Sequence, residues 1–248
     1  MGGNLRIRGV WRVGRLAGIN INLHWSFGLL GLWLGWQLFF GARSSGSVAW
    51  MTVILLALFG CVALHELAHA WTACRLGVMV KNVILLPFGG MAQIQALPHR
   101  PLADLLIAAA GPMMNFLIAA GGAATLALLG KLNFLTGFLA SPQTVIEAML
   151  QPSFHWDKIS GLIVFIVVIN LILFGFNMIP ALPLDGGRVG RALLAMLMPY
   201  RQATKIMRWF GPVVGLGLLA AAIPLRNIDL IFVGLIILLT ALFPGRWE

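Results

Sequence analysis

Long apolar stretches without a charged side chain divide the amino-acid sequence. No charged residue lies between Arg15 and Arg43, and Glu66 is the only one between Arg43 and Arg75. Four further uncharged windows follow, at residues 105–130, 159–184, 209–225 and 230–245. A helix needs about 20 apolar residues to cross the ~30 Å hydrocarbon core of a bilayer. The pattern therefore predicts six membrane-spanning helices, near residues 23–42, 48–74, 104–130, 159–179, 209–224 and 228–244.

The composition supports a membrane protein and excludes two other classes. Of the 248 residues, 60% are hydrophobic and 10% are charged, whereas a soluble domain carries about 25% charged residues. So few charges exclude a water-soluble fold, and so much apolar content excludes intrinsic disorder. We interpret the net charge of +10 as a sign of membrane topology rather than of nucleic-acid binding. The sequence thus predicts an all-α polytopic protein that resides in the lipid bilayer.

The distribution of basic residues predicts the orientation of this protein, because cytoplasmic loops are enriched in Lys and Arg. With the N-terminus inside, the six spans place 13 of the 17 basic residues on the inner side. We therefore predict a multi-pass protein of the cell (inner) membrane with both termini in the cytoplasm. The basic residues from Arg188 to Arg208 are interpreted as an inner face in contact with anionic lipid head groups.

The second predicted span contains His65-Glu66-Leu67-Ala68-His69, an H-E-x-x-H pattern. Residues four apart lie on one face of a helix, so both imidazoles can reach one zinc ion. Glu66 lies one position along, where it can act on the metal-bound water rather than on the metal. The alternative is a chance pair of packed histidines, but a carboxylate inside a membrane is costly and usually has a function. We therefore predict that this pentad binds zinc.

A catalytic zinc site needs a third protein ligand, and Asp185 is the leading candidate. It lies in the segment Asn177 to Gly187, whose two prolines and two glycines predict a broken helix. The predicted topology puts the pentad and Asp185 on the same side of the membrane, so the active site is expected towards the cytoplasm. The alternative role for Asp185 is to cap a helix or turn before two glycines, which is common for aspartate.

Residues 78–97, which follow the pentad helix, differ from the apolar spans. They are rich in β-branched residues and contain the turn sequence Pro87-Phe88-Gly89-Gly90, a pattern typical of a β-hairpin. We predict a short membrane-associated β-hairpin at this position. An exposed strand edge could capture an unwound substrate segment by strand addition. The alternative is an interfacial loop that packs on the helices.

Together these motifs resemble the site-2 protease family of intramembrane zinc metalloproteases, peptidase family M50. The segment from Asn177 to Gly186 is similar to the family's N-x-x-P-x-x-x-x-D-G motif. Residues 88–91 (Phe-Gly-Gly-Met) resemble its glycine-containing hairpin, and residues 110–115 (Ala-Gly-Pro-Met-Met-Asn) resemble the G-P-x-x-N segment of its third core helix. The resemblance covers about residues 60–190 and is to the compact form of the family, without PDZ or CBS domains.

The resemblance implies a single membrane-embedded metalloprotease domain over residues 1–248, with a catalytic core of about 48–190. It implies one Zn²⁺ ion per chain, held by His65, His69 and Asp185, with Glu66 as the general base. The implied partner is a transmembrane protein substrate, such as an anti-sigma factor, a pro-sigma factor or a signal-peptide remnant. Its peptide bond would be cut in or near the transmembrane segment.

Two asparagines and a third histidine are further polar residues with candidate roles. Asn115 is predicted to be a catalytic residue that donates an N–H group to the developing oxyanion. The alternative is an interhelical hydrogen bond, and the same two roles are open for Asn177. His24, next to Trp25, is interpreted as an interfacial anchor outside the metal site.

Two other classes of function compete with a protease. A zinc or cation transporter would need several ionisable residues along a path across the bilayer, but the third and fourth windows contain none. A membrane zincin of the CAAX-protease type would need a downstream glutamate as ligand. Glu147 and Glu248 are the only glutamates after the pentad, one predicted outside and one terminal.

Overall fold

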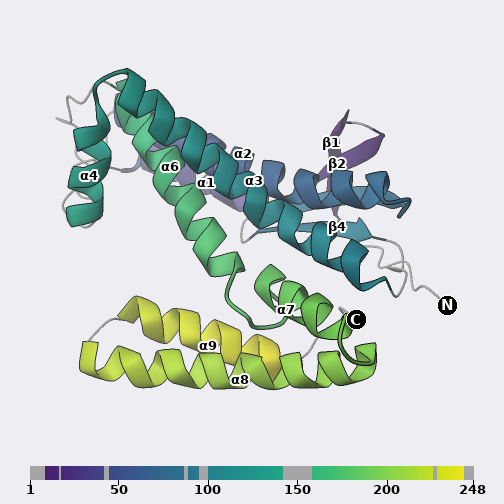
Figure 1. Ribbon diagram of the computed structural model, residues 1–248. Coiled ribbons are helices and arrows are strands. Elements are labelled where there is room, and N and C mark those ends of the chain that lie inside the picture. Colours follow the sequence, from purple (N-terminus) through teal and green to yellow (C-terminus); the bar gives the residue numbers. More distant parts are fainter. Residues whose placement is uncertain are drawn as a thin grey trace.

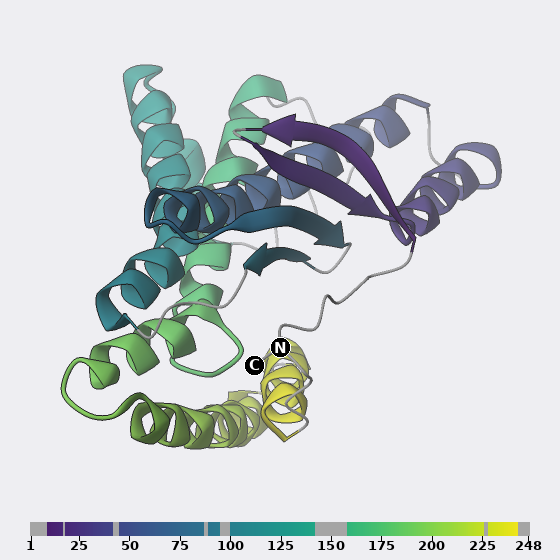
Figure 2. The ribbon, with the colours of Figure 1, turned by 90° about the vertical axis from the view of Figure 1, so that its right-hand side faces the viewer.

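The computed structural model of the protein describes residues 9–16, 18–41, 45–86, 89–94, 100–141, 158–225 and 228–242. Helices make up most of this part of the chain, and a small sheet lies along one of them (Figure 1, Figure 2). The helices are α1 (Phe27–Phe39), α2 (Ser45–Arg75), α3 (Pro101–Leu128), α4 (Leu132–Ala140), α6 (Lys158–Asn177), α7 (Asp185–Ala195), α8 (Tyr200–Leu225) and α9 (Ile228–Leu242).

Within the described residues, four helices are long and apolar enough to cross a membrane: α2, α3, α6 and α8. They correspond to the second to fifth predicted spans, although α8 begins earlier than predicted, at Tyr200. The first and last predicted spans correspond to α1 and α9, which have 13 and 15 residues. At 1.5 Å per residue, α1 is about 20 Å long and thus shorter than the ~30 Å hydrocarbon core. The total of six spans therefore stays a prediction.

The prediction of an all-α fold needs a correction, because a four-stranded sheet is present. Its strands lie in the order β1 (Val10–Leu16), β2 (Ile19–His24), β3 (Val80–Leu86) and β4 (Gly89–Ile94). β3 and β4 are antiparallel and confirm the hairpin predicted after the second span, whose turn residues 87 and 88 lie outside the described residues. β1 and β2 form a second hairpin, and β2 pairs in parallel with β3.

The N-terminal hairpin shortens the first predicted span, because its first residues belong to β2 and α1 begins at Phe27. Apolar and polar residues alternate over positions 19–23 (Ile-Asn-Ile-Asn-Leu), which favours a strand. The side-chain amides of Asn20 and Asn22 donate to Oδ1 of Asn82 on β3, at 3.3 and 3.4 Å. These polar side chains therefore find their partners in the sheet rather than in a membrane-spanning helix.

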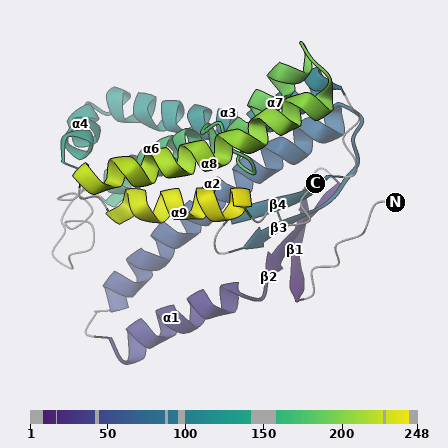
Figure 3. The ribbon, with the colours of Figure 1, turned by 90° about the horizontal axis from the view of Figure 1, so that it is seen from below.

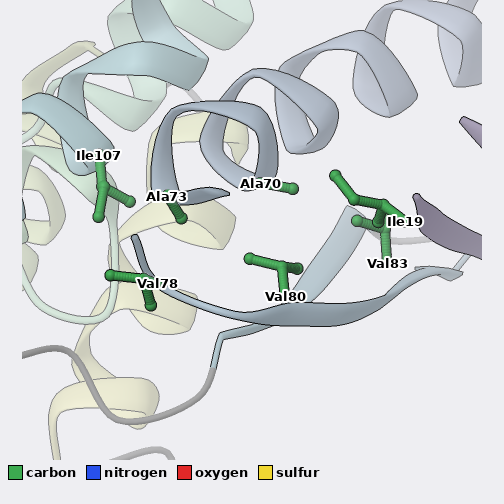
Figure 4. Close-up of a cluster of buried hydrophobic side chains, with 7 residues drawn as sticks. All are labelled: Ile19, Ala70, Ala73, Val78, Val80, Val83 and Ile107. Carbon is green, nitrogen blue, oxygen red and sulfur yellow. The ribbon is translucent and has the colours of Figure 1, made fainter. Parts of the chain in front are cut away.

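A buried apolar cluster fixes the sheet against the C-terminal half of α2 (Figure 4). Ala70 and Ala73 of α2 and Ile107 of α3 pack there with Ile19 of β2 and Val83 of β3. All five are at most 2% exposed, and full burial of one Val or Ile side chain stabilises the fold by about 1.5–3 kcal/mol. The sheet is thereby held beside the part of α2 that carries the pentad.

The central helix of the fold is α3, which packs against α2, α6 and α7. Ala119 and Leu126 of α3 pack with Val164 and Val167 of α6 in a second buried cluster. α8 and α9 pack against each other as a helical hairpin, and α7 connects this hairpin to the other helices (Figure 1, Figure 3). Three elements distant in sequence, α2, α3 and α7, therefore meet where the candidate site lies.

Candidate metal centre

Both histidines of the pentad project from one face of α2 towards the start of α7. His65 and His69 are 5% and 4% exposed, and their Nε2 atoms lie 3.1 Å apart. Oδ2 of Asp185 lies 3.1 Å from Nε2 of His65 and 3.0 Å from Nε2 of His69. In the described part of the chain, this is the one group of three His, Cys, Asp or Glu residues that could hold a metal ion. The structure thus brings together the three residues predicted as zinc ligands.

A break between α6 and α7 carries Asp185 to the histidines. α6 ends at Asn177, and Asp185 is the first residue of α7, so the predicted helix break is confirmed. A Cβ on Gly186 would clash with backbone carbonyl groups of the preceding turn, and one on Gly187 would lie 2.5 Å from the backbone nitrogen of Leu182. The absence of side chains at both positions lets the first turn of α7 fold back on the broken segment.

Hydrogen bonds at the other ring nitrogens leave Nε2 of each histidine to face the centre. Nδ1 of His69 lies 2.6 Å from the carbonyl oxygen of Ile107, which can only accept, so this Nδ1 carries a proton. Nδ1 of His65 lies 3.0 Å from the side-chain amide of Asn115. Because both Nδ1 atoms are occupied by α3, both Nε2 atoms are left for a metal ion.

The electrostatics of the carboxylate also fit a cation. Burial raises the pKa of Asp185, but hydrogen bonds from His65 and His69 outweigh burial and hold that pKa below its usual range. Each of these hydrogen bonds needs a proton on Nε2, and a metal ion would take the place of those protons. An environment that favours the charged form of Asp185 suits a metal ligand.

The spacing of the three atoms fits zinc. Ligands about 2.0–2.1 Å from a tetrahedral zinc ion lie about 3.3 Å from one another, and the three atoms here are 3.0–3.1 Å apart. Three protein ligands leave a fourth position open, which is the arrangement of catalytic rather than structural zinc sites. The donor set is therefore compatible with a hydrolytic zinc centre.

Glu66 lies beside the histidines without being one of the three converging residues. Its half-buried side chain packs against the backbone of β4, since a Cβ on Gly90 would contact Cγ of Glu66 and lie 3.0 Å from its Oε1. The sheet therefore forms one wall of the site at this carboxylate. A carboxylate next to the metal position, but outside the ligand set, can accept a proton there.

Gly111 of α3 lies directly against the two imidazoles. A Cβ at this position would clash with Nε2 of His69 and lie 2.6 Å from Nε2 of His65. We expect Gly111→Ala to weaken zinc binding, because overpacking of this kind costs about 1–3 kcal/mol, or about 5- to 140-fold in dissociation constant. Zinc titration of the purified variant against a competing chelator checks this.

Gly121→Ala is the matched control for this substitution. Gly121 lies on the same helix, and a Cβ there meets nothing within 4 Å. Its zinc dissociation constant is expected to equal that of the unchanged protein. If the two variants bound zinc equally well, the position of Gly111 over the imidazoles would not matter for the metal.

Arg188 and Arg191, which the sequence places in the basic inner face, pair with a buried aspartate of α3. Nη2 of Arg191 lies 3.1 Å from Oδ2 of Asp104, and Nη2 of Arg188 lies 3.8 Å from Oδ1 of the same residue. Tyr200 donates a hydrogen bond of 2.6 Å to Oδ2 of Asp104, which is 1% exposed. A signal was present in the sequence, because Asp104 is an acidic residue at the edge of an otherwise uncharged window.

His24 and Asn177 lie outside the group of three ligand candidates. Nδ1 of His24 lies 2.7 Å from Oγ of Ser26, in the connection between β2 and α1. Nδ2 of Asn177 donates to the carbonyl oxygen of Leu173 at 3.0 Å, within α6. His24 therefore lies apart from the group formed by His65, His69 and Asp185.

Comparisons with known proteins agree with this geometry. The sequence model of peptidase family M50 matches residues 53–219, which contain all three ligand candidates. A zinc metalloprotease of Methanocaldococcus jannaschii is 32% identical over 229 residues, which is 91% of this chain and 58% of that protein. Rip3 of Mycobacterium tuberculosis is 36% identical over 192 residues, 73% of this chain and 43% of that protein. This chain therefore spans about half the length of these relatives.

A solved structure has a similar fold over nearly the whole chain. The site-2 protease from Methanocaldococcus jannaschii superposes with a TM-score of 0.56 and 27% sequence identity, covering 96% of each chain. The family match, the relatives and this fold all agree with the resemblance of the motifs. This chain belongs to peptidase family M50, the site-2 protease family.

Proposed function

We propose that this protein is an intramembrane zinc endopeptidase, which hydrolyses a peptide bond in or near the transmembrane segment of a membrane-protein substrate. The observation that carries the proposal is the convergence of His65, His69 and Asp185 within 3.1 Å of one another. Two of the three lie in α2, a helix long and apolar enough to cross a membrane. The names of the relatives, zinc metalloprotease and site-2 protease, support the same activity.

Glu66 is the proton carrier in this proposal. Zinc held by His65, His69 and Asp185 would supply a Lewis acid and would lower the pKa of a bound water to about 7. Glu66 accepts the proton of the attacking water and later delivers it to the leaving amine. The close approach of the β4 backbone at Gly90 to the Glu66 side chain supports this role, because it leaves little room on that side of the carboxylate.

Asn115 serves the same reaction from α3. Its side chain is completely buried, and Nδ2 lies 3.0 Å from Nδ1 of His65. Oδ1 of Asn115 has no hydrogen-bond partner within the described residues. This contact supports a role in orienting the His65 ring. Nδ2 has a second N–H group, which could donate to a developing oxyanion as the sequence predicts.

The sheet is a second element of the proposal, as the place where substrate binds. β4 is the last strand in the order β1-β2-β3-β4, and its Gly90 lies against Glu66. An extended segment that adds to an edge strand satisfies its backbone groups by strand addition. We propose that an unwound part of the substrate pairs with this edge and so lies beside the metal.

The charge distribution supports the location of the proposed reaction. With the predicted topology, 13 of 17 basic residues lie on one side, which places both termini and the site towards the cytoplasm of a cell (inner) membrane. The substrate is then a transmembrane protein whose cleavage releases a cytoplasmic part, such as an anti-sigma or pro-sigma factor. In this proposal residues 1–248 act as a single domain with one Zn²⁺ ion.

A direct test uses the purified protein in detergent and a model substrate with one transmembrane segment. We expect cleavage to stop after zinc is removed with a chelator and to return on addition of Zn²⁺. The reason is that the metal ion is the Lewis acid of the proposed reaction. Mass spectrometry of the fragments locates the cut bond, which is expected in or near the apolar segment.

Reconstitution of the purified protein into liposomes separates a protease from a transporter. In sealed liposomes a transporter would move zinc ions into the lumen, which a trapped zinc-sensitive dye detects. Zinc uptake without any substrate cleavage would contradict the proposed function. Cleavage without uptake, lost and restored with the metal, is the expected outcome.

A further inference from the structure

A second group of charged and polar side chains, centred on one buried aspartate, lies next to Asp185. Its centre is Asp104 of α3, which is 1% exposed. Oδ2 of Asp104 accepts a 2.6 Å hydrogen bond from Tyr200 and lies 3.1 Å from Nη2 of Arg191. The Arg191 guanidinium in turn lies 5.0 Å from the centre of the Tyr200 ring. These contacts tie α3, α7 and the first residue of α8 together.

Arg188 connects this cluster to the metal centre. Its Nη1 lies 3.7 Å from Oδ1 of Asp185, and its Nη2 lies 3.8 Å from Oδ1 of Asp104. The guanidinium group is therefore placed between two carboxylates, with one terminal nitrogen towards each. A planar group with donors on two sides suits such a bridge, whereas the single ammonium of lysine does not.

The two oxygens of Asp185 face different partners. Oδ2 faces Nε2 of both His65 and His69, while Oδ1 faces Arg188. The side chain of Arg188 is 21% exposed and that of Asp185 is 11% exposed, so solvent screens the pair only in part. The Arg188 guanidinium at Oδ1 would hold that oxygen away from a bound metal ion, so that Oδ2 would be the ligand atom.

Charge balance shows why Arg188 stays in this position. Oδ1 of Asp104 is buried and has no hydrogen-bond partner within the described residues, and the Arg188 charge faces it. Asp104 and Asp185 together balance Arg188 and Arg191 in this cluster. Removal of one member of a buried ionic group leaves an uncompensated charge, which is strongly unfavourable.

We propose that Arg188, held in place by Asp104, is a positioning residue for the metal ligand Asp185. It fixes the carboxylate so that Oδ2 alone is presented to the metal, and it does so from outside the ligand set. This inference rests on the proposed metal site. It adds a determinant of metal affinity that lies outside both the H-E-x-x-H pentad and the segment from Asn177 to Gly186. Loss of an outer partner of this kind typically weakens metal binding by about 10- to 100-fold.

The test measures zinc affinity of the full chain in detergent, by competition with a chromophoric chelator. Arg188→Gln is expected to raise the zinc dissociation constant by about 10- to 100-fold. Arg188→Lys is expected to lie between this variant and the unchanged protein, because one ammonium can face only one of the two carboxylates. Arg201→Gln, the same change at an exposed arginine of α8, is the matched control and is expected to bind zinc normally.

A second measurement separates positioning from a general loss of stability. The visible absorption of bound Co²⁺ reports the geometry of its ligands and is expected to change in Arg188→Gln but not in Arg201→Gln. In addition, Asp104→Asn should weaken zinc binding by itself but add little to Arg188→Gln, since both changes break one chain of contacts. Fully additive effects of the two substitutions would contradict the proposed coupling.

The outcome that overturns the inference is a normal zinc dissociation constant in folded Arg188→Gln, with helical content checked by circular dichroism. If that variant does not fold, a normal zinc constant in Arg188→Lys has the same meaning. The proposed protease activity is tested separately by the unchanged protein. Suppose that Arg188→Gln binds zinc weakly and that the unchanged protein cleaves no substrate. This result would support the positioning role of Arg188 and contradict the proposed protease function.

Discussion

Replacement of Glu66 by glutamine is expected to reduce substrate cleavage by about 10²–10⁴-fold, the usual contribution of general acid–base catalysis, while zinc stays bound. The amide has nearly the size and shape of the carboxylate, so it preserves the packing against Gly90 of β4. It cannot accept and return a proton as the carboxylate does. Initial rates of cleavage of a model transmembrane substrate, measured beside the zinc content of the same sample, check both halves of this prediction.

Glu147→Gln is the matched control for this experiment. Glu147 lies outside the described residues, and the sequence predicts it on the opposite side of the membrane from the pentad. Its variant is expected to cleave at the normal rate. If Glu66→Gln also cleaved normally, Glu66 would not be the proton carrier, and the metal centre would need another base.

Replacement of Asp185 by alanine is expected to remove zinc from the protein and, with it, all cleavage. The carboxylate supplies one of three converging ligand atoms, 3.0–3.1 Å from the two Nε2 atoms. Its loss should weaken binding by more than the ~10- to 100-fold that an outer-shell partner contributes. The measurement is zinc per chain after dialysis against a buffer of fixed free zinc concentration.

Two histidine variants complete this experiment. His69→Ala should lose zinc as Asp185→Ala does, whereas His24→Ala should keep it, because His24 contacts Ser26 outside the metal centre. Cleavage is expected to follow zinc content in all three proteins. Full zinc occupancy in Asp185→Ala would exclude Asp185 from the ligand set. Its remaining role would be that of an acidic residue in the first turn of α7.

Much of the site could be predicted because its signals are local in sequence. The H-E-x-x-H spacing places His65 and His69 on one face of α2 as soon as this segment is helical. The prolines and glycines around Asp185 likewise determine a helix break, whatever packs around it. The hairpin of β3 and β4 also follows from its own residues, since its two strands are adjacent in the chain.

The N-terminal hairpin could not be predicted from the apolar pattern in the same way. β2 is stabilised by parallel pairing with β3, in which Asn20 lies opposite Asn82. A short alternating segment gains little from its own sequence, because a strand needs a partner for its backbone groups. This pairing joins residues 62 positions apart and is a property of the fold. The apolar pattern alone therefore predicts one continuous span over β2 and α1.

The sequence by itself determined the class of protein, most of its long apolar helices and the identity of the residues that meet at the centre. Only the tertiary structure decided what surrounds them: Ile107 and Asn115 at the imidazoles, Gly90 at Glu66, and Arg188 between two aspartates. The physical reason is that the sequence pattern does not specify which element each helix face packs against. Periodicity and spacing specify which residues share a helix face, but the neighbour of that face depends on how α2, α3 and α7 pack against one another.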